Sequence, residues 1–157
     1  MMKTFFPFIF YLHKVENSQH FVRSRLRGQV TDPCFKSFND GSSITISYLP
    51  DTNEILYIAN VTATSFLAMG YGSNMVNTDM VAWIADGPAS YQSDLYSVQE
   101  QEPTVLAINS YTTSFVDYGS YVVFTTTRSM TATGDDTFDI PLETQFSMVF
   151  AFLPGVT

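Results

Sequence analysis

Two short apolar runs joined by a polar turn constrain the fold of this chain more than any other feature. The runs are residues 65–70 (SFLAMG) and 80–85 (MVAWIA), each bounded by turn-forming residues. Short apolar runs with such boundaries are typical of strands buried in a β-sheet protein. The link contains Gly72, Asn74 and Asn77, residue types that favour turns. Met75 stands in this turn, and because binding sites are usually built on loops, it is the first candidate for chemistry.

The rest of the chain repeats a pattern of short strands and turns. Residues 44–49 (ITISYL) alternate apolar and polar side chains, and residues 50–53 (PDTN) form a turn that predicts a hairpin with residues 54–61. Turn signals recur about every eight to twelve residues, and no segment has a sustained helical period. We therefore predict an all-β, immunoglobulin-like antiparallel sandwich of about nine or more strands in two packed sheets.

Later segments supply the remaining predicted strands. Residues 91–97 are predicted to form a short edge strand, and residues 147–152, which are nearly continuously apolar, a central one. The other predicted strands are residues 105–111, 114–118, 120–130 and 138–142.

The first 29 residues differ from the rest. Lys3 precedes an apolar run of about eight residues, near the lower limit for a secretory signal. A basic, polar linker follows, and a leader without function is an equally good interpretation. The run is too short to cross a bilayer, which needs roughly twenty apolar residues. We expect one domain, residues 31–157, in a secreted or cell-surface protein.

The charge of the chain excludes some partners. Fifteen acidic against seven basic residues give a formal net charge of −8, and beyond Gly28 only Lys36 and Arg128 are basic. Such an acidic domain repels nucleic acids and anionic lipid surfaces. We therefore expect no nucleic-acid partner.

The histidines and the single cysteine argue against catalysis by the chain itself. His13 and His20 both precede the predicted fold, which leaves no Ser-His-Asp or Cys-His arrangement and no histidine-ligated zinc site. Cys34 has no partner for an internal disulfide and is predicted to be a half-buried structural thiol. We expect no enzyme, and at most a redox partner domain of an oxidoreductase.

The order of several motifs resembles the DOMON family. FLAMGYG is followed by SNMVNTDMVAWI, and later by VVFTTTRSMTATGDDTFDIPL and a final apolar strand. The resemblance covers roughly residues 32–152. It implies an extracellular β-sandwich of the kind found in dopamine β-monooxygenase and in cellobiose dehydrogenase cytochromes.

In haem-carrying members of that family, a methionine of the central loop and a histidine beyond the last strand ligate haem b. Met75 matches the methionine, and the histidine is expected beyond Thr157, so the resemblance implies either a domain truncated at its C-terminal end or a member without this pair. A thioether ligand favours ferrous iron and suits one-electron transfer with a redox or membrane cytochrome partner. The alternative is a cofactor-free sandwich that binds sugar or another protein. For Met75 that alternative means a hydrophobic plug closing the end of the sandwich.

Three further residues have both structural and functional interpretations. Trp83 faces either the core, which we favour, or a ligand cavity. Arg128 forms either an ion pair with the acidic loop that contains residues 135–139, or contacts a haem propionate or a sugar hydroxyl. Asn60-Val61-Thr62 is an N-glycosylation sequon, a triplet that also occurs by chance and matters only on the secretory route.

Overall fold

The computed structural model describes residues 33–72, 74, 76–99, 102–132, 140 and 148–152. In this part of the chain, ten β-strands alternate with turns and one short 3-10 helix, η1 (Gly87–Ala89). The strands are β1 (Cys34–Ser37), β2 (Ser43–Leu49), β3 (Glu54–Thr62), β4 (Phe66–Tyr71), β5 (Thr78–Ile84), β6 (Tyr91–Ser97), β7 (Thr104–Val105), β8 (Tyr111–Asp117), β9 (Tyr121–Ser129) and β10 (Met148–Phe152).

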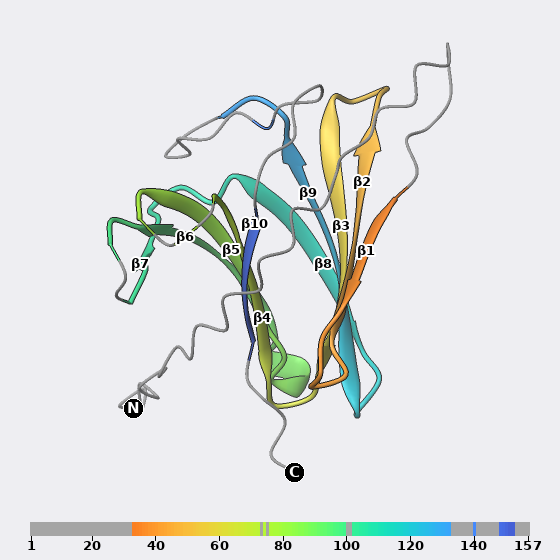
Figure 1. The fold of residues 1–157 in the computed structure, drawn as a ribbon. Coiled ribbons are helices and arrows are strands. Elements are labelled where there is room, and N and C mark those ends of the chain that lie inside the picture. Colours follow the sequence, from red (N-terminus) through yellow and green to blue (C-terminus); the bar gives the residue numbers. More distant parts are fainter. Residues whose placement is uncertain are drawn as a thin grey trace.

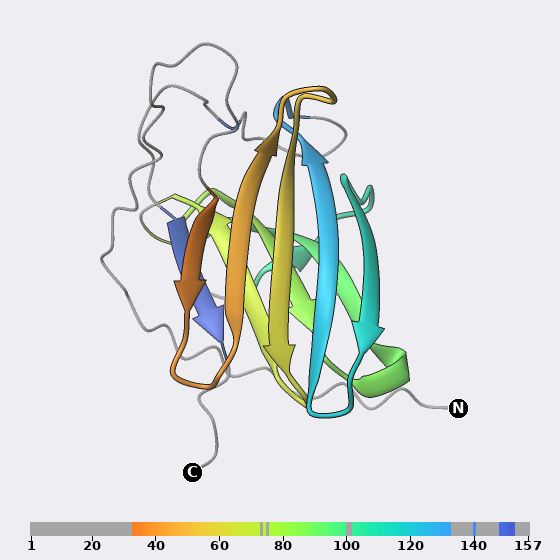
Figure 2. The same ribbon diagram turned by 90° about the vertical axis from the view of Figure 1, so that its right-hand side faces the viewer.

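The strands form two five-stranded sheets that face each other. Sheet A has the order β1-β2-β3-β9-β8, and sheet B has the order β10-β4-β5-β6-β7. Figure 1 shows the two layers edge-on, and Figure 2 shows sheet A in front of sheet B. All strand pairs in the described residues are antiparallel. The predicted all-β antiparallel sandwich is therefore confirmed.

The β2–β3 hairpin follows the alternation of its sequence. Ile46 pairs with Tyr57 and Ile44 with Ala59, and all four side chains point toward sheet B and are buried. At the turn, Asn53 adopts a φ of 55°, a left-handed conformation that asparagine tolerates. Its side chain accepts a hydrogen bond from the Tyr48 hydroxyl at 3.1 Å. Alternation and turn chemistry together fix the register of this hairpin.

Two of the predicted strand positions are wrong. Residues 91–97 were predicted as an edge strand, but β6 lies between β5 and the two-residue β7, which forms the edge. The last strand was predicted to be central, but β10 pairs with β4 and lies at the other edge of sheet B. Its apolar sequence reflects packing, since Phe150 contacts Phe38 with ring centroids 5.3 Å apart.

Other boundaries also shift. The predicted strand at residues 105–111 is divided between the end of β7 and the start of β8, with Leu106 donating its backbone N–H to Asp94 O at 2.9 Å. Residues 138–142 lie outside the described residues except Ile140, which is buried and donates its backbone N–H to Met130 O. No helix among the described residues is long and apolar enough to cross a membrane.

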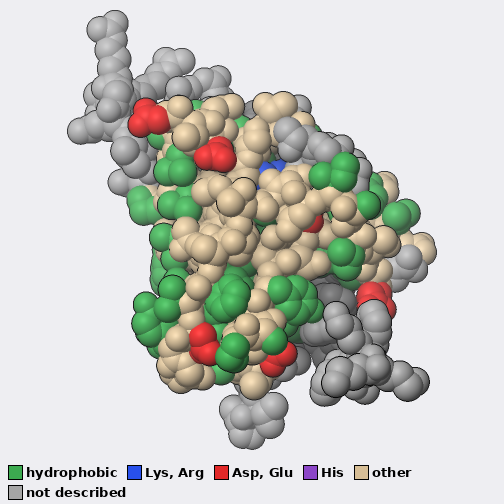
Figure 3. All heavy atoms as spheres, turned by 180° about the vertical axis from the view of Figure 1, so that it is seen from behind, with side chains coloured by type: hydrophobic (Ala, Val, Ile, Leu, Met, Phe, Trp, Pro, Cys, Tyr) green, Lys and Arg blue, Asp and Glu red, His purple; other side chains and the backbone are tan. Residues whose placement is uncertain are grey.

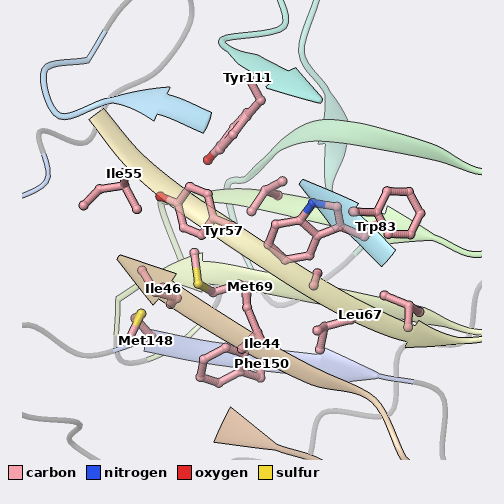
Figure 4. Packing of buried hydrophobic residues seen from close by; sticks show 14 of the residues in the cluster. Ile44, Ile46, Ile55, Tyr57, Leu67, Met69, Trp83, Tyr111, Met148 and Phe150 are labelled. Atoms are coloured by element: carbon pink, nitrogen blue, oxygen red, sulfur yellow. The ribbon is translucent and has the colours of Figure 1, made fainter. Parts of the chain in front are cut away.

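The core lies between the sheets. Figure 4 shows side chains from both layers meeting there. Its buried members include Ile44, Ile46, Ile55, Tyr57, Leu67, Met69, Val81, Trp83, Tyr111, Phe124, Met148 and Phe150. Cys34 packs against its margin and is half-buried, and burial raises the pKa of its thiol although Lys36 acts in the opposite direction.

Candidate functional site

The turn between β4 and β5 is held by its own polar side chains. Met75 and Ser73 lie outside the described residues, but the residues around them are defined. The backbone N–H of Val76 donates to the Asn74 side chain at 3.0 Å, and the Thr78 hydroxyl donates to Asn74 O at 2.9 Å. Asn77 has a φ of 50° and bonds through its backbone N–H to Val98 O at 3.4 Å. The turn that carries Met75 is thus fixed at both sides of the methionine.

Inside the sandwich, at the end where β4 leads into this turn, lies a cluster of buried polar aromatic residues. Tyr71 is the last residue of β4, and its hydroxyl is hydrogen-bonded to the hydroxyl of Tyr57. Tyr111 lies beside Tyr57, with ring centroids 6.1 Å apart. The Arg128 guanidinium lies over the rings of Tyr71 and Tyr111, with its carbon 5.2 Å and 5.7 Å from their centroids. Arg128 is 1% exposed, so this cation is held in the interior by aromatic faces.

The environment of this cluster keeps the hydroxyls of Tyr57 and Tyr71 neutral. Burial raises the pKa of Tyr57 well above its ordinary value, and the neighbouring Tyr71 and Tyr111 add to the shift. Burial also raises the pKa of Tyr71, while Arg128 and the hydrogen bonds to Tyr71 act in the opposite direction. Neutral phenols can donate and accept hydrogen bonds without a buried negative charge. The cluster is therefore a fixed polar layer beneath the Met75 turn.

Trp83 lies in the core, on the face of β5 that points toward sheet A. Its indole N–H donates to the Thr126 hydroxyl at 2.9 Å, and its ring lies 5.9 Å from that of Tyr57, centroid to centroid. Thr113 donates a second hydrogen bond to the same Thr126 oxygen at 3.0 Å. Tyr57 lies between Tyr111 and Trp83 in this interior (Figure 4). Trp83 thus occupies the position that the sequence favoured, with a partner for its buried donor.

Sheet B has a second apolar cluster on the face that points away from sheet A. Ala68 and Met80 are 0% and 1% exposed, although the opposing sheet does not cover them. At Gly70 on the same face, an added Cβ would lie 2.8 Å from Thr78 Cγ2 and 3.0 Å from Val149 Cγ2, so only glycine fits there. The buried members are Phe66, Ala68, Met80, Ala82, Leu95 and Ala151. The outer face of sheet B is therefore buried although it points away from sheet A. It has low relief because its middle is made of small side chains.

The structure brings together only some of the residues selected from the sequence. Trp83 and Arg128 share the inter-sheet core, and Arg128 contacts Tyr71, which leads into the turn that carries Met75. The acidic loop proposed as the partner of Arg128 lies outside the described residues, as does Met75 itself. Asn60 lies apart from them, on the solvent side of sheet A. Among the described residues, no group of three or more His, Cys, Asp or Glu side chains could hold a metal ion.

The sequence did not single out Tyr57, Tyr71 and Tyr111 as a cluster. The available signal was alternation: Tyr57 follows Ile55 and precedes Ala59 on the inward face of one strand, which placed a tyrosine among core positions. Their proximity depends on the pairing of β3 and β8 with β9. That pairing joins segments far apart in sequence, and no local pattern predicts it.

Two antiparallel five-stranded sheets packed face to face define this chain as a β-sandwich protein. No protein-family model and no curated protein matches the sequence. Among solved structures, the fold is similar to the cytochrome domain of Myriococcum thermophilum cellobiose dehydrogenase, with a TM-score of 0.50 and 12% sequence identity. The match covers 57% of this chain and 48% of that domain, about half its length. At this identity the similarity shows the fold.

Proposed function

We propose that this chain is an extracellular, noncatalytic module of the DOMON type that holds a flat apolar ligand, haem b, with Met75 as one axial ligand. The observation that carries the proposal is the second apolar cluster, which centres on the two strands that the Met75 turn joins and extends to β6 and β10. The similarity to a cytochrome domain supports it at the level of the fold.

The outer face of sheet B fits a planar apolar group. Ala68, Gly70 and Ala82 give it low relief at the middle, and Phe66 and Leu95 are larger side chains of the same face. Ligand sites are mostly apolar, with a few polar groups that orient the ligand. A porphyrin ring would meet apolar side chains on this face, and Met75 of the adjoining turn would supply the thioether ligand in this proposal.

The donor set available to the iron is unusual. The sequence holds no histidine after His20, so residues 21–157 offer Met75 but no imidazole. Arg128 is buried among tyrosines, and in this proposal it positions Tyr71 and the turn instead of contacting a propionate. Trp83 fills the core behind β5 and supports the ligand face from the other side.

In this proposal haem and the chain have different chemical roles. When bound, haem b supplies a one-electron couple, and a thioether ligand raises its reduction potential. The chain holds the residues on either side of Met75 through the Asn74 and Thr78 hydrogen bonds, and its apolar face would exclude water. Exchange of single electrons with a redox or membrane cytochrome partner is the corresponding role.

Haem titration tests the proposal directly. The purified chain, mixed with haemin under oxidising and reducing conditions, should develop a protein-bound Soret band whose position reflects a methionine ligand. Met75→Leu should remove the methionine signature because leucine has similar volume and no sulfur. Met69→Leu is the matched control, since Met69 lies on the same hairpin but points into the inter-sheet core. No bound Soret band, or equal spectra for Met75→Leu and the parent chain, would reject the haem form.

The lack of histidine after His20 favours one second candidate, a cofactor-free sandwich that binds a sugar or a protein. In that form the outer face of sheet B would stay buried without haem. Met75 would close the end of the sandwich as an apolar plug. Isothermal titration with oligosaccharides in the absence of haem separates this candidate from the first. Heat on sugar addition, without any haem binding, would establish it.

A further inference from the structure

The outer face of sheet A is exposed and has almost no charge. By register, Ile58 shares a row with Thr45 and Thr125, and Asn60 shares the next row with Ser43 and Val123. The outward positions of the three central rows are Phe35, Ser37, Ser43, Thr45, Ser47, Leu56, Ile58, Asn60, Thr112, Ser114, Val116, Val123, Thr125 and Thr127. None of them is acidic or basic, and no described element covers this face (Figure 2).

Four described acidic residues of sheet A and its turns lie near the ends of its strands, outside these three rows. Asp40 and Asp51 lie in turns at the ends of its strands, Asp117 ends β8, and Glu54 begins β3. The view from behind is edge-on to both sheets and shows acidic side chains separated by uncharged surface (Figure 3). In a chain of net charge −8, a solvent-exposed sheet face without charged residues needs an explanation. Depletion of charge at the centre with charge at the rim is the composition of a covered surface.

Exposed apolar side chains on the same face support this conclusion. Phe35 is 61% exposed, Ile58 41% and Val116 54%. Most of the other outward positions in these rows are serines and threonines. Such a surface suits an occupant that has both apolar faces and hydroxyl groups and no charge, which describes a neutral oligosaccharide.

Asn60 lies at the middle of this face. It belongs to β3, the third of five strands, and its side chain points outward between those of Ser43 and Val123. It is half-buried, and no hydrogen bond to another described residue holds its side-chain amide. Thr62, which completes the sequon, points to the same side and is fixed by its hydroxyl donating to Asp40 O at 2.9 Å.

We propose that Asn60 carries an N-linked glycan, and that this glycan is the occupant that covers the uncharged outer face of sheet A. The inference rests on the extracellular location given under the proposed function, but not on haem. In the secretory lumen, Asn60 Nδ2 attacks C1 of the first sugar of a lipid-pyrophosphate-linked oligosaccharide. The new N–C bond replaces the C1–O bond to pyrophosphate, which leaves as the amide gives up one proton. The first sugars then lie over the row of Ile58 and Thr125, where they keep a second copy of the sheet from docking.

The test expresses the full chain behind a heterologous secretion signal in a eukaryotic host. Mass spectrometry of the Asn60 peptide, before and after peptide-N-glycosidase, should show a glycan that is lost in Asn60→Gln. The matched control is Tyr118→Asn, which turns residues 118–120 into a second sequon on the exposed β8–β9 turn. An empty Asn60 beside a filled position 118 overturns the proposal at this site. If both positions are empty, the glycan proposal is also overturned, and the haem titration tests the proposed function independently.

Coverage of the face is measured separately. The glycosylated chain should run as a monomer in size-exclusion chromatography with light scattering, while endoglycosidase-trimmed protein and Asn60→Gln should shift toward two copies as concentration rises. Adding Thr125→Lys to Asn60→Gln should restore the monomer, because it places a charge on the uncovered face. Trimming the folded protein avoids any effect of substitution on folding. If Asn60 is filled and trimming its glycan leaves the mass distribution unchanged, the covering role is overturned.

Discussion

The outward faces of the two sheets differ although both belong to the same sandwich. In sheet A, strand β3 alternates between buried and more exposed residues, whereas every residue of β4 in sheet B is buried. Ile58 on sheet A is 41% exposed, while Ala68 on sheet B is 0% exposed. A sheet that is buried on both faces has two packing partners, and a sheet that alternates has one. The inter-sheet core is one partner of sheet B, and its outer face requires another.

The amino-acid sequences of the strands already show this difference. FLAMGY and the MVAWI part of β5 are continuous runs of mostly apolar or small residues, while SITISYL and EILYIANVT alternate. Periodicity therefore predicted not only strands but also how many faces each strand buries. The two faces consequently have different candidate occupants, an apolar ligand on sheet B and a glycan on sheet A.

The two outer faces should differ most in how much stability they lose when a carboxylate is placed on each. Ala68→Asp puts a charge on the interior face of sheet B, and we expect it to lower the free energy of unfolding by about 3–5 kcal/mol, the cost of an uncompensated buried charge. Thr125→Asp on sheet A should cost about 1 kcal/mol or less, within the span of strand propensities. Urea unfolding of both variants provides the measurement.

Ala68→Asn separates charge from size, because the amide has the shape of the carboxylate without its ionisation. It should be milder than Ala68→Asp but clearly worse than Thr125→Asp. Should Ala68→Asp and Thr125→Asp prove equally mild, the outer face of sheet B is not an interior surface, and the ligand proposal loses its main support.

The fold was predictable because its signals are local. Strand alternation, the Pro50–Asn53 turn and the apolar runs around Met75 each lie within ten or so residues, and they gave the sandwich class and the β2–β3 hairpin. The position of β10 was not predictable, because its apolar composition reflects the contact with Phe38 and not a central place in the sheet. The tyrosine cluster depends on pairing between distant strands. For the candidate site, Met75 as a candidate residue and the core position of Trp83 were therefore predictable from the sequence, whereas the environment of Arg128 was not.

A second, smaller effect extends the comparison from the faces to the interior. The pKa of Tyr57 is raised well above its ordinary value by burial, so the folded state keeps this phenol neutral when the unfolded chain ionises it. The stabilising contribution is therefore fully present below about pH 10, the unfolded pKa of tyrosine, and is lost as pH rises through the folded pKa. Each such group lowers stability by about 1.4 kcal/mol per pH unit in that window.

Urea unfolding between about pH 9 and pH 11 should therefore show a steep fall for the parent chain and a shallower one for Tyr57→Phe. Tyr118→Phe, on the exposed β8–β9 turn, is the control for the loss of one tyrosine hydroxyl. A slope that Tyr57→Phe leaves unchanged would mean that the phenol is not held neutral in the interior.

The finest form of the comparison uses two adjacent residues of β9 that point to opposite sides. Thr126 is fully buried and accepts hydrogen bonds from the Trp83 indole at 2.9 Å and from Thr113 at 3.0 Å, whereas Thr125 faces solvent. Thr126→Val keeps the shape but leaves a buried indole N–H without its acceptor, and should cost about 1–3 kcal/mol. Thr125→Val should change the free energy of unfolding by no more than about 0.5 kcal/mol, as surface substitutions do.

Trp83 is the single tryptophan of the chain, so its fluorescence reports the change directly, with an altered emission maximum expected for Thr126→Val alone. Equal effects of the two substitutions would show that the indole draws no stability from its partner, and that burial alone holds Trp83 behind the ligand face.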